Sequence, residues 1–178
     1  MDIYKNKLPL IHKIKRFTWN LVWQILVRPL PRNTGRVWVL FLLRLFGAKV
    51  HRTANVYSSV KIYAPWNLEM QKYSCLAPEV DCYNVDKVLV GAYSTVSQKT
   101  YLCSASHDVT KSSNPLITAP IIIKNQVWIG ASSFIGMGAT IGQGAVVGAT
   151  SSIYKDVDAW NIVGGNPAKF IKKRVIND

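Results

Sequence analysis

The sequence is poor in cysteine, which excludes a fold that depends on disulfide bonds. Its three cysteines, Cys75, Cys82 and Cys103, are odd in number and show neither CxxC spacing nor the spacing of metal ligands. Disulfide-dependent domains and zinc sites need cysteines in closely spaced sets. Residues 1–17 also lack the continuous apolar run and the small-residue cleavage site of a secretory signal. We therefore expect a protein of the reducing cytoplasm that requires no metal.

Acidic residues are scarce as well. Nine Asp and Glu stand against 22 Lys and Arg, which gives a formal net charge of +13 at pH 7. The excess lies in residues 1–52, where eleven Lys and Arg accompany the single acid Asp2. A basic segment can bind nucleic acid, but these cations alternate with Leu, Val and Trp, and no helix-turn-helix, RRM or zinc motif accompanies them. Nucleic acid is therefore not an expected partner.

No apolar run in the sequence is long enough to cross a bilayer. The two longest runs, residues 17–27 and 37–46, are shorter than the roughly 20 residues that a spanning helix needs, and Arg44 interrupts the second. The segment between them contains two prolines and a glycine, which predicts a turn. Residues 1–47 are therefore expected to form a basic, Trp-rich arm of two short helices.

What the sequence does contain is a repeat of six residues. In residues 123–158 the first position of each hexad is Ile or Val, the second is Gly in four of six hexads, and the fifth is Val, Ser or Ala. Neither the 3.6-residue period of a helix nor the two-residue period of a strand explains this spacing. A chain that coils in triangular turns does explain it, because each hexad forms one strand and one corner, and three hexads close a turn of about 18 residues. The repeat predicts a parallel β-helix with aliphatic side chains inside.

Weaker hexads extend the coil toward the amino terminus. Their first positions are Val50, Val56, Ile62, Leu68, Val80, Val90, Val96 and Leu102. The frame slips between Val80 and Val90, and again between Leu102 and Ile123. The second slip predicts that residues 107–120 leave the coil as an excursion loop, the kind of element on which a rigid scaffold often carries function. The expected body thus spans residues 48–168, and residues 169–178 form a basic tail.

His107 begins the excursion loop and is followed by Asp108. Imidazole exchanges protons near neutral pH more readily than other side chains, which suits it to deprotonating a sugar hydroxyl. Asp108 could orient this ring or cap the loop backbone. Two alternatives stay open: a lone histidine can be structural, and Cys103 could act as a nucleophile paired with His107, although its hexad position asks only for a small residue.

A strip of small side chains runs along one edge of the predicted coil. Residues 18 apart stack in neighbouring turns, so Ala149 lies over Ala131, and Gly148 lies over Gly130. The strip could admit the thin pantetheine arm of coenzyme A, or it could simply be what the hexads require. Cations in residues 169–174 could contact the phosphates of a nucleotide cofactor, or they could be a solvated end of the chain.

Five segments of the sequence resemble the hexapeptide-repeat acetyltransferases. They are Tyr101–Asp108, Ala119–Val157, Gly165–Arg174, Pro65–Leu68 and Tyr83–Asp86. Within that family the chain is most similar to colanic acid and exopolysaccharide O-acetyltransferases, and more distantly to galactoside and maltose acetyltransferases. The similarity covers roughly residues 30–175, with Lys99 standing where the family usually has Gly.

The resemblance implies an all-β fold, a left-handed parallel β-helix of hexapeptide repeats that carries the short helical arm and the excursion loop. It also implies a homotrimer with acetyl-CoA, the acyl donor, lying between adjacent prisms. In such an enzyme His107 is the general base that deprotonates the acceptor hydroxyl, which then attacks the thioester directly. Carried over by position, the cofactor-binding residues are Ala131, Ala149, Lys155, Lys169 and Lys172, the acceptor-binding residues are Asn84, Asp81 and Tyr83, and Trp128 packs under the cofactor.

The expected function is therefore acetyl-CoA-dependent O-acetylation of a saccharide hydroxyl in the biosynthesis of an exopolysaccharide or another surface glycan. The acceptor would be lipid-linked or nucleotide-linked. N-acetylation of an amino sugar and a non-catalytic β-helix scaffold remain alternatives, and the intact His107 favours an enzyme. Residues 1–47 could lie on the inner membrane, with Trp at the headgroups and cations on anionic lipid, or could cap the coil's strand edges.

Overall fold

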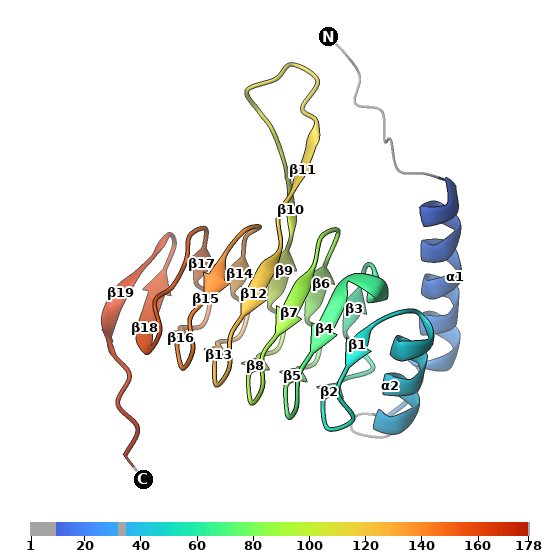
Figure 1. Ribbon diagram of the computed structural model, residues 1–178, viewed down its shortest axis with the longest axis horizontal. Helices are drawn as coiled ribbons and strands as arrows, with labels where there is room; N and C mark the ends of the chain where they lie inside the picture. Colours follow the sequence, from blue (N-terminus) through green and yellow to red (C-terminus); the bar gives the residue numbers. More distant parts are fainter. Residues whose placement is uncertain (1–9, 32–34, 178) are drawn as a thin grey trace.

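The computed structural model describes residues 10–31 and 35–177, and in it the chain winds into a three-sided coil (Figure 1). Each side is a sheet of short strands, and successive turns of the coil pair in parallel. Side A consists of β1 (Lys49–Val50), β4 (Leu68–Met70), β7 (Val88–Val90), β12 (Ile121–Ile123) and β15 (Thr140–Ile141). Side B consists of β2 (Asn55–Val56), β5 (Cys75–Leu76), β8 (Thr95–Val96), β13 (Trp128–Ile129), β16 (Val146–Val147), β18 (Asn161–Gly165) and β19 (Ala168–Lys173). Side C consists of β3 (Lys61–Ile62), β6 (Asp81–Tyr83), β9 (Tyr101–Cys103), β14 (Phe134–Ile135) and β17 (Ser152–Ile153).

The core of the coil is built from the first positions of the hexads. Ile129 pairs with Val147, and Ile135 pairs with Ile153, at the expected offset of 18 residues. These four side chains are at most 2% exposed. Small residues at the fifth position, such as Ser133 and Ala145, are also buried, because they lie at the corners of the triangle where space is tight. The predicted parallel β-helix is confirmed.

The first turns of the coil are longer than the sequence frame predicts. Val50 pairs with Met70, and Met70 pairs with Val90, so each of these turns contains 20 residues rather than 18. The two additional residues lie between sides C and A, where Leu68 and Met70 on one short strand both point inward. Leu68 therefore does not begin a hexad. Val80 does not begin one either: it is the buried fifth residue of the hexad that starts at Leu76, and the next hexad starts at Cys82. The slip expected between Val80 and Val90 is confirmed, since the core positions Cys82 and Val90 are eight residues apart. An equal slip between Ile62 and Met70 was not expected.

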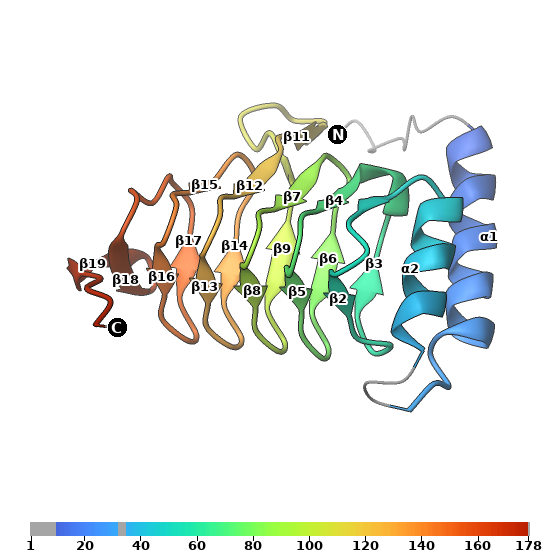
Figure 2. The ribbon, with the colours of Figure 1, turned by 60° about the horizontal axis from the view of Figure 1, so that its bottom comes forward.

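Two helices close the amino-terminal end of the coil, as Figures 1 and 2 show. They are α1 (Leu10–Leu26) and α2 (Arg36–Leu45). On α1, the buried Trp19 and Trp23 donate their indole N–H groups to the carbonyl oxygens of Ile62 and Val60, at 2.8 and 2.9 Å. The helix α2 packs its buried residues against β1 and β2. The helices thus cover the unpaired edges of the first strands, which a solenoid would otherwise expose. None of the helices in the described residues is long and apolar enough to span a bilayer.

The carboxyl-terminal end is closed by an antiparallel hairpin of β18 and β19. Residues 169–173, expected to be part of a tail, are therefore a strand. Arg174 anchors the chain that follows, since its Nη1 donates to the carbonyl oxygens of Gln126 and Gly144, each at 2.9 Å. Its guanidinium thus has a structural role through Nη1, and the suggested contact of Arg174 with a phosphate stays a prediction.

Candidate active site

A second hairpin projects from the coil between sides C and A, above β9 and β12 in Figure 1. It consists of β10 (Ala105–His107) and β11 (Leu116–Thr118), which pair antiparallel, with His107 opposite Leu116. The predicted excursion loop is confirmed, although paired strands form its base. His107 is exposed at the end of β10, so the hairpin carries its imidazole away from the packed interior.

A backbone carbonyl orients the His107 imidazole. Its Nδ1 lies 2.6 Å from the carbonyl oxygen of Asn114, on the other arm of the hairpin. A carbonyl oxygen can only accept a hydrogen bond, so Nδ1 carries the proton, and in the neutral ring Nε2 carries the lone pair. The Asn114 backbone has φ of +42°, a left-handed conformation that Asn tolerates better than most residues. Sequence reasoning missed Asn114, and its only signal was an Asn in a loop before Pro115.

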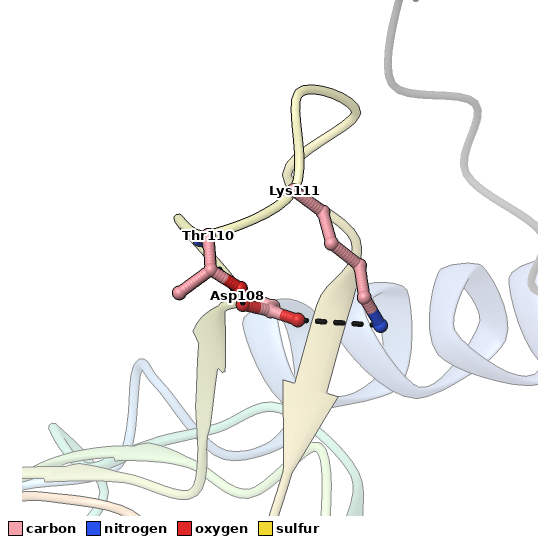
Figure 3. A network of polar contacts seen from close by, with 3 residues as sticks. All are labelled: Asp108, Thr110 and Lys111. Carbon is pink, nitrogen blue, oxygen red and sulfur yellow. Dashed lines mark hydrogen bonds and ion pairs between the residues drawn. The ribbon is translucent and has the colours of Figure 1, made fainter.

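Asp108 organises the loop rather than the imidazole (Figure 3). Its Oδ1 accepts hydrogen bonds from the backbone N–H and the hydroxyl of Thr110, at 3.1 and 2.6 Å, and its Oδ2 lies 3.3 Å from Nζ of Lys111. The hydrogen bond from the Thr110 hydroxyl, together with the backbone N–H and Lys111, lowers the pKa of the Asp108 carboxyl. Of the two roles considered for Asp108, the structure supports the loop cap.

Cys103 has a local explanation. Its thiol donates a hydrogen bond to the carbonyl oxygen of Ala105, at 3.1 Å, and the side chain is half-buried at the end of β9. Packing and this bond account for a small residue here. Burial raises the pKa of Cys75 and of Cys82, which disfavours the reactive thiolate at both positions.

The three residues expected to face an acceptor sugar have different surroundings. Asn84 is fully buried between sides C and A, where its Oδ1 accepts from the Ala64 N–H at 2.9 Å and its Nδ2 donates to the Ala64 carbonyl at 2.6 Å. Both ends of the amide are thus used within the corner, and direct contact of Asn84 with the sugar stays a prediction. Asp81 and Tyr83 instead point outward from β6, and Asp81 lies 3.7 Å from Lys61.

Asp81 and Tyr83 line a groove between α1 and side C. Its volume is about 310 Å³. Tyr63 and Tyr83 form one wall, with ring centroids 4.7 Å apart in an edge-to-face arrangement. The groove is completed by Trp19, Asn20, Trp23, Gln24, Arg28, Lys61 and Ile62. Aromatic rings combined with amide and charged groups are typical of small-molecule sites. Sequence reasoning missed the contribution of α1, because nothing in the sequence indicates that this helix lies beside β3 and β6.

The residues expected to hold acetyl-CoA do not all lie on one edge. Ala131, Ala149 and Lys169 lie along the edge between sides B and C, with Lys169 opposite Gly164 in the terminal hairpin. Lys155 lies after β17 on the edge between sides C and A, and Lys172 lies within side B, opposite Ile162. All three lysines are exposed.

Stacking explains one glycine of the small-residue strip. A Cβ added to Gly130 would lie 2.5 Å from the backbone nitrogen of Ala149, so the neighbouring turn occupies that space, and Gly130 is buried. At Gly148 the nearest atom to an added Cβ is 3.4 Å away, and this glycine is partly exposed. The packing interpretation therefore holds for Gly130, and a ligand could reach Ala131, Gly148 and Ala149.

Two further residues of the sequence comparison lie on or near this edge. Trp128 is 54% exposed on the outer face of side B, and its Nε1 donates to the Ser97 hydroxyl at 3.0 Å. Its ring is therefore accessible to a ligand, and its packing under the cofactor stays a prediction. Lys99 has φ of +61°, which explains why glycine suits this position. It lies between β8 and β9, on a different edge from the hairpin of His107.

His107 and the Ala131–Ala149 strip lie on opposite edges of side C. The outer face of side C between them carries Tyr83, Tyr101, Phe134 and Tyr154, whose successive ring centroids are 6.4, 5.7 and 5.5 Å apart. One copy of the chain therefore does not bring the two together. Within residues 10–31 and 35–177, no group of three or more His, Cys, Asp or Glu side chains could hold a metal ion.

The sequence is similar to that of a bacterial acetyltransferase. Over 138 residues it is 41% identical to an Escherichia coli (strain K12) protein named "Putative colanic acid biosynthesis acetyltransferase WcaF". The match covers 78% of this chain and 76% of that protein. No protein-family model matches the sequence.

Solved structures share the fold. The hexapeptide-repeat acetyltransferase VCA0836 of Vibrio cholerae is 23% identical, with a TM-score of 0.82 and 93% coverage of both chains. The same protein has been solved in complex with acetyl coenzyme A, with a TM-score of 0.79, 21% identity and coverage of 97% of this chain and 94% of that one. A maltose O-acetyltransferase of Clostridium difficile 630 is 21% identical, with a TM-score of 0.84 and coverage of 94% and 90%. The chain belongs to the hexapeptide-repeat acetyltransferases. The family expected from the sequence segments is thereby confirmed.

Proposed function

We propose that the protein transfers the acetyl group of acetyl-CoA to a hydroxyl of a saccharide, with His107 as the general base. The observation that carries this proposal is the hydrogen bond from His107 Nδ1 to the Asn114 carbonyl oxygen. Because that bond fixes the tautomer, Nε2 is the proton acceptor, and it lies on an exposed hairpin that a substrate can approach.

The proposed reaction needs one proton acceptor and no covalent acyl-enzyme. Nε2 of His107 removes the hydroxyl proton as the acceptor oxygen forms its bond to the acetyl carbonyl carbon. Acetyl-CoA supplies the acetyl group as a thioester, and the sulfur leaves and takes up the proton that His107 holds. While the ring is positively charged, its Nδ1–H still donates to the Asn114 carbonyl. A hydrogen bond donated by a charged group is stronger than one donated by a neutral group, so this contact stabilises the imidazolium.

We infer that the site is completed between copies in a homotrimer. His107 and the Ala131–Ala149 strip flank side C, so a threefold arrangement with side C facing the axis brings the His107 edge of one copy against the strip of the next. The aromatic outer face of side C supports this arrangement. Acetyl-CoA then lies along Ala131 and Ala149. Its phosphates meet Lys169 on the same edge, Lys172 on the adjoining side B, and Lys155 on the facing edge of the neighbouring copy. The Vibrio cholerae relative solved with acetyl-CoA supports this choice of donor.

The proposed acceptor is a saccharide of a surface glycan, either lipid-linked or nucleotide-linked. The groove of Tyr63, Tyr83 and Asp81 offers ring faces and polar groups that suit a sugar, and Asn84 holds the corner beneath it through Ala64. The names of the relatives, a colanic acid acetyltransferase and a maltose O-acetyltransferase, support a sugar hydroxyl.

The test is His107→Ala, assayed by release of free coenzyme A thiol with a panel of sugars and amino sugars. We expect turnover to fall by about 10² to 10⁴, the usual contribution of a general base, while acetyl-CoA still raises the melting temperature. His51→Ala is the matched control, since His51 is exposed at a distant corner and bonds Thr53. Undiminished turnover in His107→Ala would rule out His107 as the general base. If acetyl-CoA did not raise the melting temperature of the wild type, a non-catalytic β-helix scaffold would be favoured. Turnover on amino sugars alone would favour N-acetylation.

A further inference from the structure

Helix α1 has two apolar faces. One face packs Trp19 and Trp23 on the coil. The other points outward, and its residues recur every three or four positions, the spacing that places them on one side of a helix: Leu10, Ile14, Phe17, Leu21 and Ile25. Phe17 is 70% exposed. A helix on the surface of a globular protein normally presents charged and polar residues on its outer face, so this face is unusual.

Helix α2 repeats the arrangement. Val37, Phe41 and Leu45 follow one another at intervals of four residues, on the side away from the buried Val39 and Leu43, and Val37 is 77% exposed. Trp38 stacks on Phe41 with ring centroids 5.6 Å apart, and its Nε1 donates to the carbonyl oxygen of Leu26 at the end of α1. This bond ties the start of α2 to the end of α1, and both helices lie at one end of the coil (Figure 2). We refer to these outward residues of α1 and α2 together as the helical face.

The helical face concentrates the exposed apolar surface of the molecule. In the part of the chain that the structure describes, 22 large hydrophobic residues are exposed, and 11 of them belong to α1 and α2. Contiguous apolar surface on this scale marks an interface with a protein or a membrane.

Unpaired cations surround the helical face. The sequence contains no Asp or Glu between Asp2 and Glu69. The cations on or beside the two helices include Lys13, Lys15, Arg28 and Arg36, and no ion pair involves any of them within the described residues. The surface is thus both apolar and positively charged.

These charges favour a bilayer over a second copy of the chain. Two copies joined through the helical face would bring like charges together without a single acidic partner from either pair of helices, which opposes association. An anionic bilayer satisfies both properties, because its interface accepts Trp, Phe and Leu side chains and its headgroups attract Lys and Arg.

We propose that the helical face docks on an anionic lipid bilayer, with α1 and α2 lying in the headgroup region and the coil standing on the membrane. The groove beside Asn20, Gln24 and Arg28 is then next to the lipid surface, where a lipid-linked saccharide would arrive. The docking itself stands on the helical face alone, whether or not the chain acetylates a sugar.

Flotation of the full chain with vesicles tests the proposal. Wild-type protein should float with vesicles of phosphatidylcholine and phosphatidylglycerol, float much less with phosphatidylcholine alone, and lose binding as salt is raised. The triple variant F17Q/L21Q/F41Q should lose flotation. V175Q/I176Q is the matched control, since Val175 and Ile176 are equally exposed at the opposite end of the coil, and it should float like the wild type. Circular dichroism and melting temperature establish that each variant is folded.

A second set of variants keeps the test decisive if the apolar triple variant does not fold. Each Lys or Arg near an anionic surface contributes a factor of about five to binding, so K13Q/K15Q/R36Q should weaken it by about a hundredfold. Flotation of either triple variant like the wild type overturns the proposal. The proposal is also overturned if lipid-free F17Q/L21Q/F41Q has a lower particle mass than the wild type in analytical ultracentrifugation. That result would show that a second copy of the chain covers the helical face. Turnover of soluble acceptors should be unchanged in these variants, which separates this test from that of acetyl transfer.

Discussion

Nδ1 of His107 lies 2.6 Å from the carbonyl oxygen of Asn114, a residue seven positions further along the chain. The group that orients the ring is therefore part of the backbone, and it depends on the left-handed conformation of Asn114 rather than on its side chain. A β-branched residue rarely adopts that conformation, whereas glycine does so freely.

The first prediction follows from this dependence. Asn114→Val should displace the carbonyl and lower kcat by between about tenfold and a hundredfold, with the KM for acetyl-CoA unchanged. Asn114→Gly should retain most of the activity. Steady-state kinetics of the two variants check this, and equal losses in both would assign the effect to the side chain.

The second prediction concerns the two edges of side C. His107→Ala and Ala149→Trp should each be inactive alone, but refolding equal amounts of both together should restore activity. If each site takes His107 from one copy and the strip from the next, about a quarter of the sites contain neither substitution. Thiol-release assays on the mixture measure the recovery. Activity no higher than the sum of the two separate variants would mean that each copy builds its own site.

The third prediction concerns the carboxyl of Asp108. Because its pKa is lowered in the folded hairpin, the ionised carboxylate stabilises the loop above the ordinary pKa of 3.8 and ceases to do so as the pH falls through the lowered value. Thr110→Val removes the hydroxyl donor and should raise the pKa of Asp108 toward 3.8, so the loop loosens at a higher pH. Carboxyl ¹³C shifts followed by NMR report the pKa. Lys111→Ala removes the ammonium beside the carboxylate and should also raise the pKa of Asp108.

The fourth prediction tests how closely the turns stack. Gly130→Ala places a methyl group 2.5 Å from the nitrogen of Ala149 and should lower the free energy of unfolding by about 1 to 3 kcal/mol. In Gly148→Ala the nearest atom, the carbonyl oxygen of Val163, is 3.4 Å from the new methyl group, an ordinary contact. Chemical denaturation compares the two, and equal stabilities would mean that the turns separate easily.

The fifth prediction concerns the buried amide of Asn84. Asn84→Ala leaves the N–H of Ala64 without its partner, whereas the carbonyl of Ala64 still accepts from the Asn67 N–H, so the free energy of unfolding should fall by about 1 to 3 kcal/mol. Asn55→Ala is the control, because among the residues that the structure describes the Asn55 amide has only the weak partner Cys75 Sγ, at 3.9 Å. If Asn84→Ala melts like the wild type but shows a raised KM for the acceptor, Asn84 contacts the sugar after all.

The fold could be predicted from the sequence because the six-residue repeat determines which side chains point inward and which strands pair. From Ile123 to Ile153, each aliphatic residue at a sixth position is a buried residue of the core, and the offset of 18 gives the pairing of the strands. The 20-residue turns could not be predicted in the same way. Leu68 and Met70 are both apolar and two positions apart, so the sequence does not reveal which one continues the hexad.

The candidate site was predicted only in part, for a physical reason. His107 is a side chain whose chemistry the sequence displays, and the loop that carries it follows from the break in the period. Asn114 acts through its carbonyl, a group that every residue has, so no residue type could have indicated it. Asn84 has a polar side chain that is buried, and its partner Ala64 is 20 residues away in another turn.

The edge between sides C and A is where the length of the chain varies. It holds the two extra residues of each early turn and also the whole hairpin of β10 and β11, yet Val90 and Ile123 still pair across that hairpin. Stacking of the interior thus places no limit on how much polypeptide this edge carries. A longer or shorter segment grafted between His107 and Leu116 would leave the rest of the coil in register, which makes this edge the natural place to redesign which acceptor the protein receives.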